Sequence, residues 1–181
     1  MLAPSADQRP VAAQPFWRAN PAATAALIIA LVSAATLAGA WFLELVVGLK
    51  PCPLCLEQRV PHYIAVPLAL IVALAAWRRA PRALVIGGLI ALGALMAWGA
   101  YLGVYHAGIE WKFWAGPAEC SGPAQLGPAG DFMKRLSTVN ITRCDEASWR
   151  FLGISLAGYN ALISSALAAL ALAAAWATRG R

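Results

Sequence analysis

Four cysteines are the residues whose types and spacing suggest chemistry, and they fall into two groups. Cys52 and Cys55 form a C-x-x-C motif with the sequence Cys-Pro-Leu-Cys, whereas Cys120 and Cys144 are 24 positions apart. On the chain-entropy model, a disulfide closing the 25-residue loop from Cys120 to Cys144 stabilises a fold by ~3.5 kcal/mol, against ~2 kcal/mol for the four-residue loop. A disulfide between Cys120 and Cys144 therefore suits a structural role. The tight pair suits a two-electron redox switch, because strained or exposed disulfides are the labile ones.

Proximity along the chain favours the disulfides Cys52–Cys55 and Cys120–Cys144, although four cysteines allow three connectivities. A zinc site is the alternative use of four cysteines, and it usually brings together two close pairs. The second two cysteines are too far apart in the sequence for that pattern. We therefore expect redox-active disulfides and no metal.

Arg59 and His106 are the further candidates for a site around the C-x-x-C motif. Cys55 is expected at the N-terminus of a helix, where the helix dipole stabilises a thiolate. Arg59 follows four residues later on the same face and supplies a permanent cation. His106 is expected at the same depth, either as an ordinary interfacial residue or as a hydrogen-bonding partner of a membrane-borne electron acceptor. His62 receives no role.

The elements that carry these residues follow from composition. The chain has 181 residues, 61% hydrophobic and only 12% charged, with a mean hydropathy of +0.65, whereas a soluble domain has about a quarter charged residues. Four runs without Asp, Glu, Lys or Arg are 25, 18, 27 and 28 residues long: Ala19–Leu43, Val60–Trp77, Ala83–Ile109 and Phe151–Thr178. Since about 20 residues span a bilayer, the sequence predicts an all-α membrane protein, a bundle of four transmembrane helices.

The expected helices lie at about 21–46, 55–77, 83–106 and 150–177, within a membrane domain of residues 21–178. Residues 1–20 and 179–181 are the expected cytoplasmic ends, and about 47–54 and 107–149 are the outer loops. Short arginine-rich segments indicate the cytoplasmic side, so both termini are placed inside and the cysteines outside. This topology explains the net charge of +6 without nucleic acid. A signal peptide cleaved after Ala38-Gly39-Ala40 is the alternative, but its apolar run is too long.

Three segments carry a resemblance to a known family. They are Pro51-Cys52-Pro53-Leu54-Cys55-Leu56-Glu57-Gln58-Arg59, then Gly116-Pro117-Ala118-Glu119-Cys120, and finally Cys144-Asp145-Glu146-Ala147-Ser148-Trp149 with Phe151-Leu152-Gly153. Together they resemble the bacterial disulfide bond formation protein B (DsbB) family. That family has a four-helix membrane bundle with both termini cytoplasmic, so the resemblance agrees with the topology above and implies the bacterial inner membrane.

The resemblance implies a reaction, the reoxidation of a periplasmic DsbA-type thiol oxidase with transfer of the electrons to a membrane quinone, ubiquinone or menaquinone. The partner's thiolate would attack Cys120 and release Cys144, which would then react with Cys52. Cys55 would be left as the thiolate facing the quinone. Arg59 would bind the quinone oxygen, and His106 would lie beside it.

Some points differ from the family or stay open. Gln58 stands where some members have an acidic residue. A vitamin K epoxide reductase-like quinone reductase is one alternative, but such proteins place the C-x-x-C motif on the last helix. A non-enzymatic scaffold braced by two disulfides is the other. The sequence does not distinguish the quinone, a general oxidase from one dedicated to a single client, or the oligomeric state.

Overall fold

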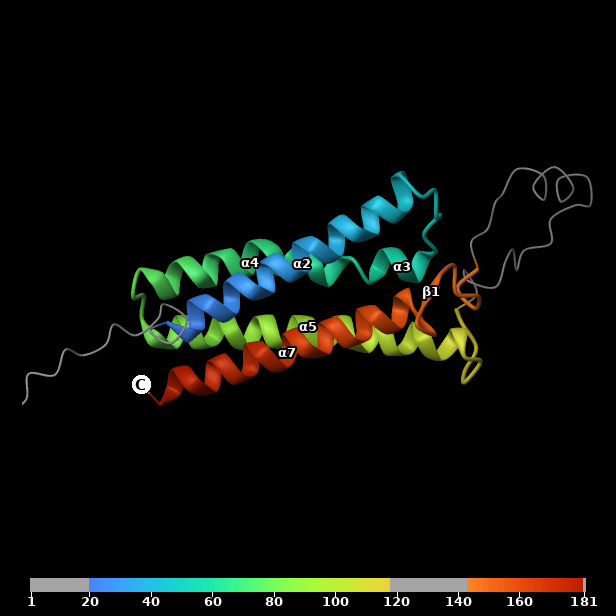
Figure 1. Ribbon diagram of the computed structural model, residues 1–181. Helices are drawn as coiled ribbons and strands as arrows, with labels where there is room; N and C mark the ends of the chain where they lie inside the picture. Colours follow the sequence, from blue (N-terminus) through green and yellow to red (C-terminus); the bar gives the residue numbers. More distant parts are fainter. Residues whose placement is uncertain (1–19, 118–142, 181) are drawn as a thin grey trace, which may run out of the picture.

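The computed structural model describes residues 20–117 and 143–180, and these contain four helices long and apolar enough to cross a membrane. The spans are α2 (Pro21–Leu45), Pro53–Trp77, α5 (Arg82–Glu110) and α7 (Leu156–Arg179). The second span is divided into a short α3 (Pro53–Glu57) and a longer α4 (Val60–Trp77). The four spans lie side by side as a bundle, which confirms the predicted fold class (Figure 1).

Capping residues set where the helices begin. Asn20 precedes α2 and its side-chain oxygen accepts a hydrogen bond from the Ala23 N–H at 3.1 Å. Ser155 precedes α7 and accepts one from the Gly158 N–H at 3.2 Å. Such caps satisfy backbone N–H groups that have no partner within the first helical turn.

At the end of the bundle that carries the C-x-x-C motif, three helix boundaries differ from those expected by two residues or more. The second span begins at Pro53 instead of residue 55, since proline is favoured in a first helical turn. The third continues to Glu110 instead of ending at 106, and the chain leaves the helix where Lys112 adopts a left-handed φ of 63°. The fourth begins at Leu156 instead of 150.

A small β-hairpin occupies the residues before the fourth span, so α7 begins later in the sequence than expected. Strands β1 (Arg150–Phe151) and β2 (Ile154–Ser155) pair antiparallel. The two residues that join them, Leu152 and Gly153, have φ values of 49° and 82°, as type I′ hairpin turns require. Phe151-Leu152-Gly153 therefore forms a tight turn that directs the chain into α7.

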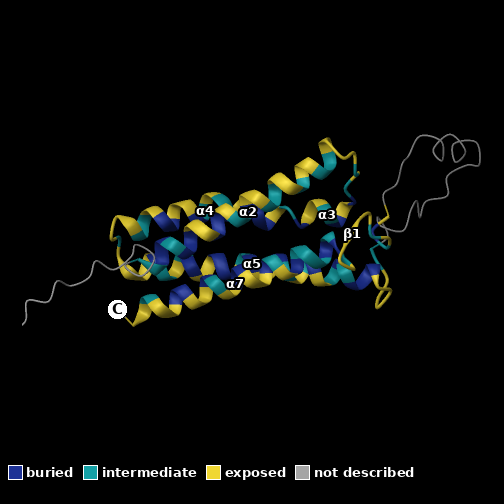
Figure 2. Ribbon diagram, viewed as in Figure 1, coloured by how far each residue is buried: buried dark blue, intermediate teal, exposed yellow. Residues whose placement is uncertain are grey.

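Small residues allow the helices to approach closely. The main helix pairs are α5 with α7 and α2 with α4, and the buried surface at their contacts is rich in alanine, while the outward faces are exposed (Figure 2). At Gly103 a Cβ atom would lie 2.7 Å from the backbone nitrogen of Ala161, so α5 and α7 meet there without an intervening side chain. This is the packing expected of membrane helices.

The two ends of the bundle carry different parts of the chain. The described chain ends, Asn20 and Gly180, lie at one end, and α3 with the hairpin lies at the other (Figure 1). The side of a membrane that each end faces stays a prediction from the charge distribution.

Candidate redox site

The C-x-x-C motif forms the start of the second span. Cys52 is the N-cap of α3, and its sulfur accepts a hydrogen bond from the Cys55 N–H at 3.2 Å. The two sulfurs are 2.7 Å apart and are not joined by a disulfide in the structure. The disulfide between them stays a prediction. The hydrogen bond between the Cys52 thiol and the Cys55 sulfur, together with burial, raises the pKa of the Cys52 thiol.

His106 lies directly beside this pair. Its Nε2 atom is 3.7 Å from the Cys52 sulfur and 3.9 Å from Oε1 of Glu110, one helical turn further along α5. The other carboxylate oxygen of Glu110, Oε2, is buried and has no hydrogen-bond partner among the described residues. The structure thus brings together the cysteine pair and the histidine that sequence reasoning had placed at the same depth.

These residues also offer ligand atoms for a metal. The two sulfurs and a ring nitrogen of His106 all lie within 4.8 Å of one another, which suits a tetrahedral ion such as Zn²⁺. Only the dithiol form provides both thiolates. Any metal would therefore compete with disulfide formation at Cys52 and Cys55.

Cys144, in the segment before β1, packs against the C-x-x-C motif. It is fully buried in a small cluster with Cys52, Leu54 and Ile109, with Cys55 packed against it. Cys144 is itself disulfide-bonded. The predicted partner, Cys120, lies outside the described residues, and the pairing Cys120–Cys144 stays a prediction.

Charged residues flank Cys144 on the surface. Asp145 accepts hydrogen bonds from Arg143 at 2.9 Å and from Lys112, just beyond α5, at 2.8 Å. These two cations hold the pKa of the Asp145 carboxyl well below its usual range. The interaction with Lys112 connects the segment that carries Cys144 to the end of α5.

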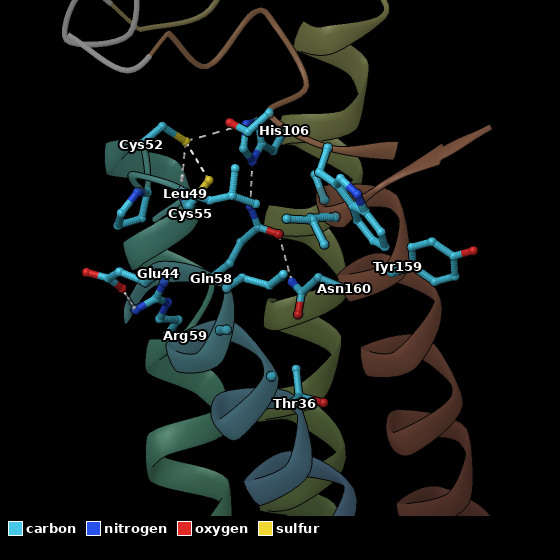
Figure 3. Close-up of a pocket in the computed structure, with 18 of the residues that line it drawn as sticks. Thr36, Glu44, Leu49, Cys52, Cys55, Gln58, Arg59, His106, Tyr159 and Asn160 are labelled. Carbon is cyan, nitrogen blue, oxygen red and sulfur yellow. Dashed lines mark hydrogen bonds and ion pairs between the residues drawn. The ribbon is translucent and has the colours of Figure 1, made fainter. Parts of the chain in front are cut away.

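A cavity of about 280 Å³ opens between α2 and the other helices, next to Cys55. Its walls are mostly apolar, and the polar groups are gathered at the cysteine end, as Figure 3 shows. Arg59 lines the cavity, but its guanidinium is already engaged: Nη1 donates to Oε2 of Glu44 at 2.6 Å, and the group lies 5.6 Å from the ring centre of Trp41. Sequence reasoning predicted Arg59 and missed both partners.

A buried chain of hydrogen bonds connects three of the spans. Gln58 contacts His106 at 2.6 Å, and Asn160 of α7 donates to Oε1 of Gln58 at 2.8 Å. Asn160 also contacts His62 at 3.0 Å, and His62 lies 3.5 Å from Ser164. Sequence reasoning assigned no role to Gln58 or His62. The sequence feature that could have identified these residues is their polarity within apolar spans. Polar side chains there have an unfavourable free energy of burial and commonly have a function.

Fold and site together define a class, a membrane-embedded thiol–disulfide oxidoreductase, in which a C-x-x-C motif adjoins an apolar cavity and packs against a second, disulfide-bonded cysteine. Residues 22–174 match the family model described as disulfide bond formation protein DsbB. The chain belongs to that family.

Curated relatives agree with this assignment. Proteins described as disulfide bond formation protein B include one from Marinobacter nauticus, 34% identical over 80% of this chain and 86% of the relative. Another, from Verminephrobacter eiseniae, is 34% identical over 81% of each chain. One from Polaromonas sp. is 29% identical over 80% of this chain and 85% of the relative. No solved structure matches the chain significantly.

Proposed function

We propose that this protein reoxidises a periplasmic DsbA-type thiol oxidase and passes the electrons through its two cysteine pairs to a membrane quinone, ubiquinone or menaquinone. It would do so in the bacterial inner membrane, with both termini cytoplasmic and the cysteine loops in the periplasm. The observation that carries the proposal is the packing of Cys144 against Cys52 beside a cavity lined by Cys55 and Arg59.

Thiol–disulfide exchange accounts for the use of two pairs. A thiolate of the partner attacks Cys120, the Cys120–Cys144 bond breaks, and Cys144 leaves with the bonding electron pair. The Cys144 thiolate then attacks Cys52, and Cys55 leaves as a thiolate when the Cys52–Cys55 bond breaks. The second thiol of the partner displaces Cys120, which attacks Cys144 and releases Cys52. The net result is an oxidised partner and a reduced Cys52–Cys55 pair.

The cavity suits a quinone head group. Its apolar walls match the ring, and Arg59 at its polar end is a hydrogen-bond donor for a ring oxygen, with His106 lining the cavity beside the cysteines. A bound quinone would accept two electrons and two protons. Arg59 would stabilise negative charge that develops on the oxygen, in a site with little water. Glu44 would hold the guanidinium in place through their 2.6 Å contact.

A coupled assay tests the proposal. The purified full-length protein is mixed with a reduced DsbA-type thioredoxin-fold protein and a soluble ubiquinone or menaquinone analogue, and quinol and remaining partner thiols are followed together. We expect one quinol for each pair of thiols oxidised. Cys55→Ser is expected to abolish quinol formation, and Arg59→Ala is expected to slow it.

Leu56→Ser is the matched control, because it introduces the same side chain into the exposed neighbour of Cys55 on α3. It is expected to keep the quinone activity. Disulfides that do not react with the partner, together with no quinone reduction, would overturn the proposal and favour the disulfide-braced scaffold.

A further inference from the structure

The amide side chains of Gln58 and Asn160 connect His106 to the middle of the bundle, and the proposed exchange chemistry does not use them. Gln58 follows α3, is only 6% exposed, and lies between His106 of α5 and Asn160 of α7. An amide has one donor end and one acceptor end, so its orientation determines what a neighbouring histidine must do. The orientation of Gln58 therefore indicates which ring nitrogen of His106 carries the proton.

Backbone carbonyls fix the orientation of both amides. Nε2 of Gln58 donates to the Leu54 carbonyl at 3.3 Å, and Nδ2 of Asn160 lies 3.4 Å from the Gly99 carbonyl. A carbonyl oxygen only accepts, so the NH₂ end of each amide must face it. The remaining contact, from Nδ2 of Asn160 to Oε1 of Gln58, agrees with both orientations.

The orientation of Gln58 fixes the tautomer of His106. Nδ1 of His106 lies 2.6 Å from the NH₂ group of Gln58, which can only donate, so Nδ1 must accept and carries no proton. In the neutral ring the proton is then on Nε2. Nε2 faces the Cys52 sulfur and Oε1 of Glu110, and the Cys144 backbone also accepts a hydrogen bond from the ring, so acceptors surround the N–H that this assignment provides.

The geometry points to Gln58 and Asn160 as positioning residues that hold His106 in the Nε2–H tautomer and direct this N–H at the sulfur of Cys52. Gln58 acts directly on the ring. Asn160 acts one step away, by fixing the carbonyl end of Gln58. His62 extends the set, since its Nε2 donates to Oδ1 of Asn160 at 3.0 Å.

The same chain of contacts does not serve as a proton wire. A neutral amide can pass a proton on only through a high-energy imidic acid form, and two amides in series stand between the two histidines. Nδ1 of His62, at the far side, is buried without a partner among the described residues. The network therefore orients groups without conducting protons between them.

The directed N–H has a chemical use that rests on the proposed function. When Cys120 attacks Cys144, the Cys52–Cys144 bond breaks and Cys52 leaves with the bonding electron pair. The Nε2–H of His106 can donate a hydrogen bond to the thiolate as it forms, and such charge-assisted bonds are strong. Loss of this one bond is expected to slow the step roughly tenfold.

Histidine nitrogen NMR tests the inference, and the chain suits it because it has only two histidines. Full-length protein labelled with ¹⁵N-histidine is reduced and placed in lipid nanodiscs, and His62→Phe assigns the signals of His106. In the wild type we expect a protonated Nε2 and an unprotonated Nδ1. Gln58→Glu, which replaces the donor with an acceptor, is expected to bring a proton to Nδ1, and Gln58→Leu is expected to give a mixture of tautomers.

Ser164→Ala is the matched control, because Ser164 contacts His62 at the far side of the network. It should leave the signals of His106 unchanged. A proton on Nδ1 in the wild type, unchanged signals in both Gln58 variants, or an equal change in Ser164→Ala would each overturn the inference. The exchange rate, measured with the reduced partner and no quinone, should fall in Gln58→Leu in proportion to the fraction of His106 that loses the Nε2 proton, with the roughly tenfold loss as the limit. No exchange in the wild type would contradict the proposed function instead, while the NMR signals would still decide the tautomer.

Discussion

The two ends of the helical bundle are held together by different means. At the end where the described chain starts and finishes, the helices meet through alanine and a few larger side chains such as Leu89, Leu92 and Met96, all fully buried. At the cysteine end the contacts are ion pairs, hydrogen bonds and sulfur atoms around a cavity. Close packing supplies stability at the first end, and at the second end the fold leaves space and polar groups for chemistry.

Figure 1 shows how the helices produce this difference. α2 diverges from the other spans toward the cysteine end, whereas α5 and α7 remain side by side along their length. The close approach at Gly103 keeps the latter pair together. The cavity therefore has one wall formed by α2 and another formed by elements that small residues hold in contact.

The largest effect on stability is expected at the packed end. Leu92→Ala would leave a cavity among tightly packed side chains and lower the free energy of unfolding by about 2–5 kcal/mol. Denaturant or thermal unfolding in detergent measures this loss. The activity of the remaining folded protein should match the wild type, and a reduced turnover with unchanged stability would contradict the division into two ends.

The ion pair at the cysteine end should contribute less to the free energy of unfolding than the packing around Leu92. Glu44 and Arg59 have side chains that are 26% and 11% exposed and are joined at 2.6 Å. A double-mutant cycle with Glu44→Gln and Arg59→Ala is expected to give a coupling energy of about 1–3 kcal/mol in unfolding experiments. Strictly additive effects of the two substitutions would show that Arg59 is held by other contacts.

Ser33 in α2 allows a further test of the difference between the two ends, because it is a polar residue in the packed region. Its hydroxyl oxygen is fully buried and has no hydrogen-bond partner among the described residues. Ser33→Ala is therefore expected to leave stability unchanged or raise it by up to about 1 kcal/mol. A clear loss of stability in the same unfolding assay would reveal a partner for the hydroxyl.

The smallest effect concerns acid pH at the segment that carries Cys144. The pKa of Asp145 is lowered by Arg143 and Lys112, so the stabilisation from these contacts is present above the unfolded pKa of about 4. It is lost as the pH falls through the lower folded pKa. Limited proteolysis of this segment from neutral to strongly acidic pH should show loosening only below about pH 4.

Asp145→Asn is the matched variant, because it removes the charge while keeping the shape. It should loosen the segment at neutral pH and remove the acid dependence. High salt should weaken the wild-type effect, since these charges are exposed. Loosening between pH 5 and 7 would indicate another titrating group.

Sequence reasoning succeeded where a single stretch of chain determines the answer. Four spans follow from the length of the apolar runs, and the C-x-x-C motif with Arg59 follows from residue type and spacing. The hairpin that delays α7 was harder to predict, because Phe151-Leu152-Gly153 is as apolar as the helix that follows. Only the left-handed φ values of Leu152 and Gly153 reveal the turn.

The partners within the site could not be read from the sequence. Asn160 and Gln58 are 102 positions apart, and Glu44 and Arg59 are 15 apart in different helices. Such pairs depend on how the spans rotate and tilt against one another. Glu44 could still have been singled out from the sequence, because it is an acidic residue at the end of an apolar run.

The break between α3 and α4 has a mechanical consequence. α3 has only five residues, and Pro61 has no N–H to continue the hydrogen-bond ladder across the junction. At that junction Arg59 donates to Leu56, a tighter turn than that of an α-helix. The cysteines thus sit on a short helix that the α-helical hydrogen-bond pattern does not join continuously to α4, while Gln58 and Arg59 tie the junction to the neighbouring spans. Movement of the sulfurs between partners would bend the chain at this junction, and the contacts of Gln58 and Arg59 limit how far it can bend.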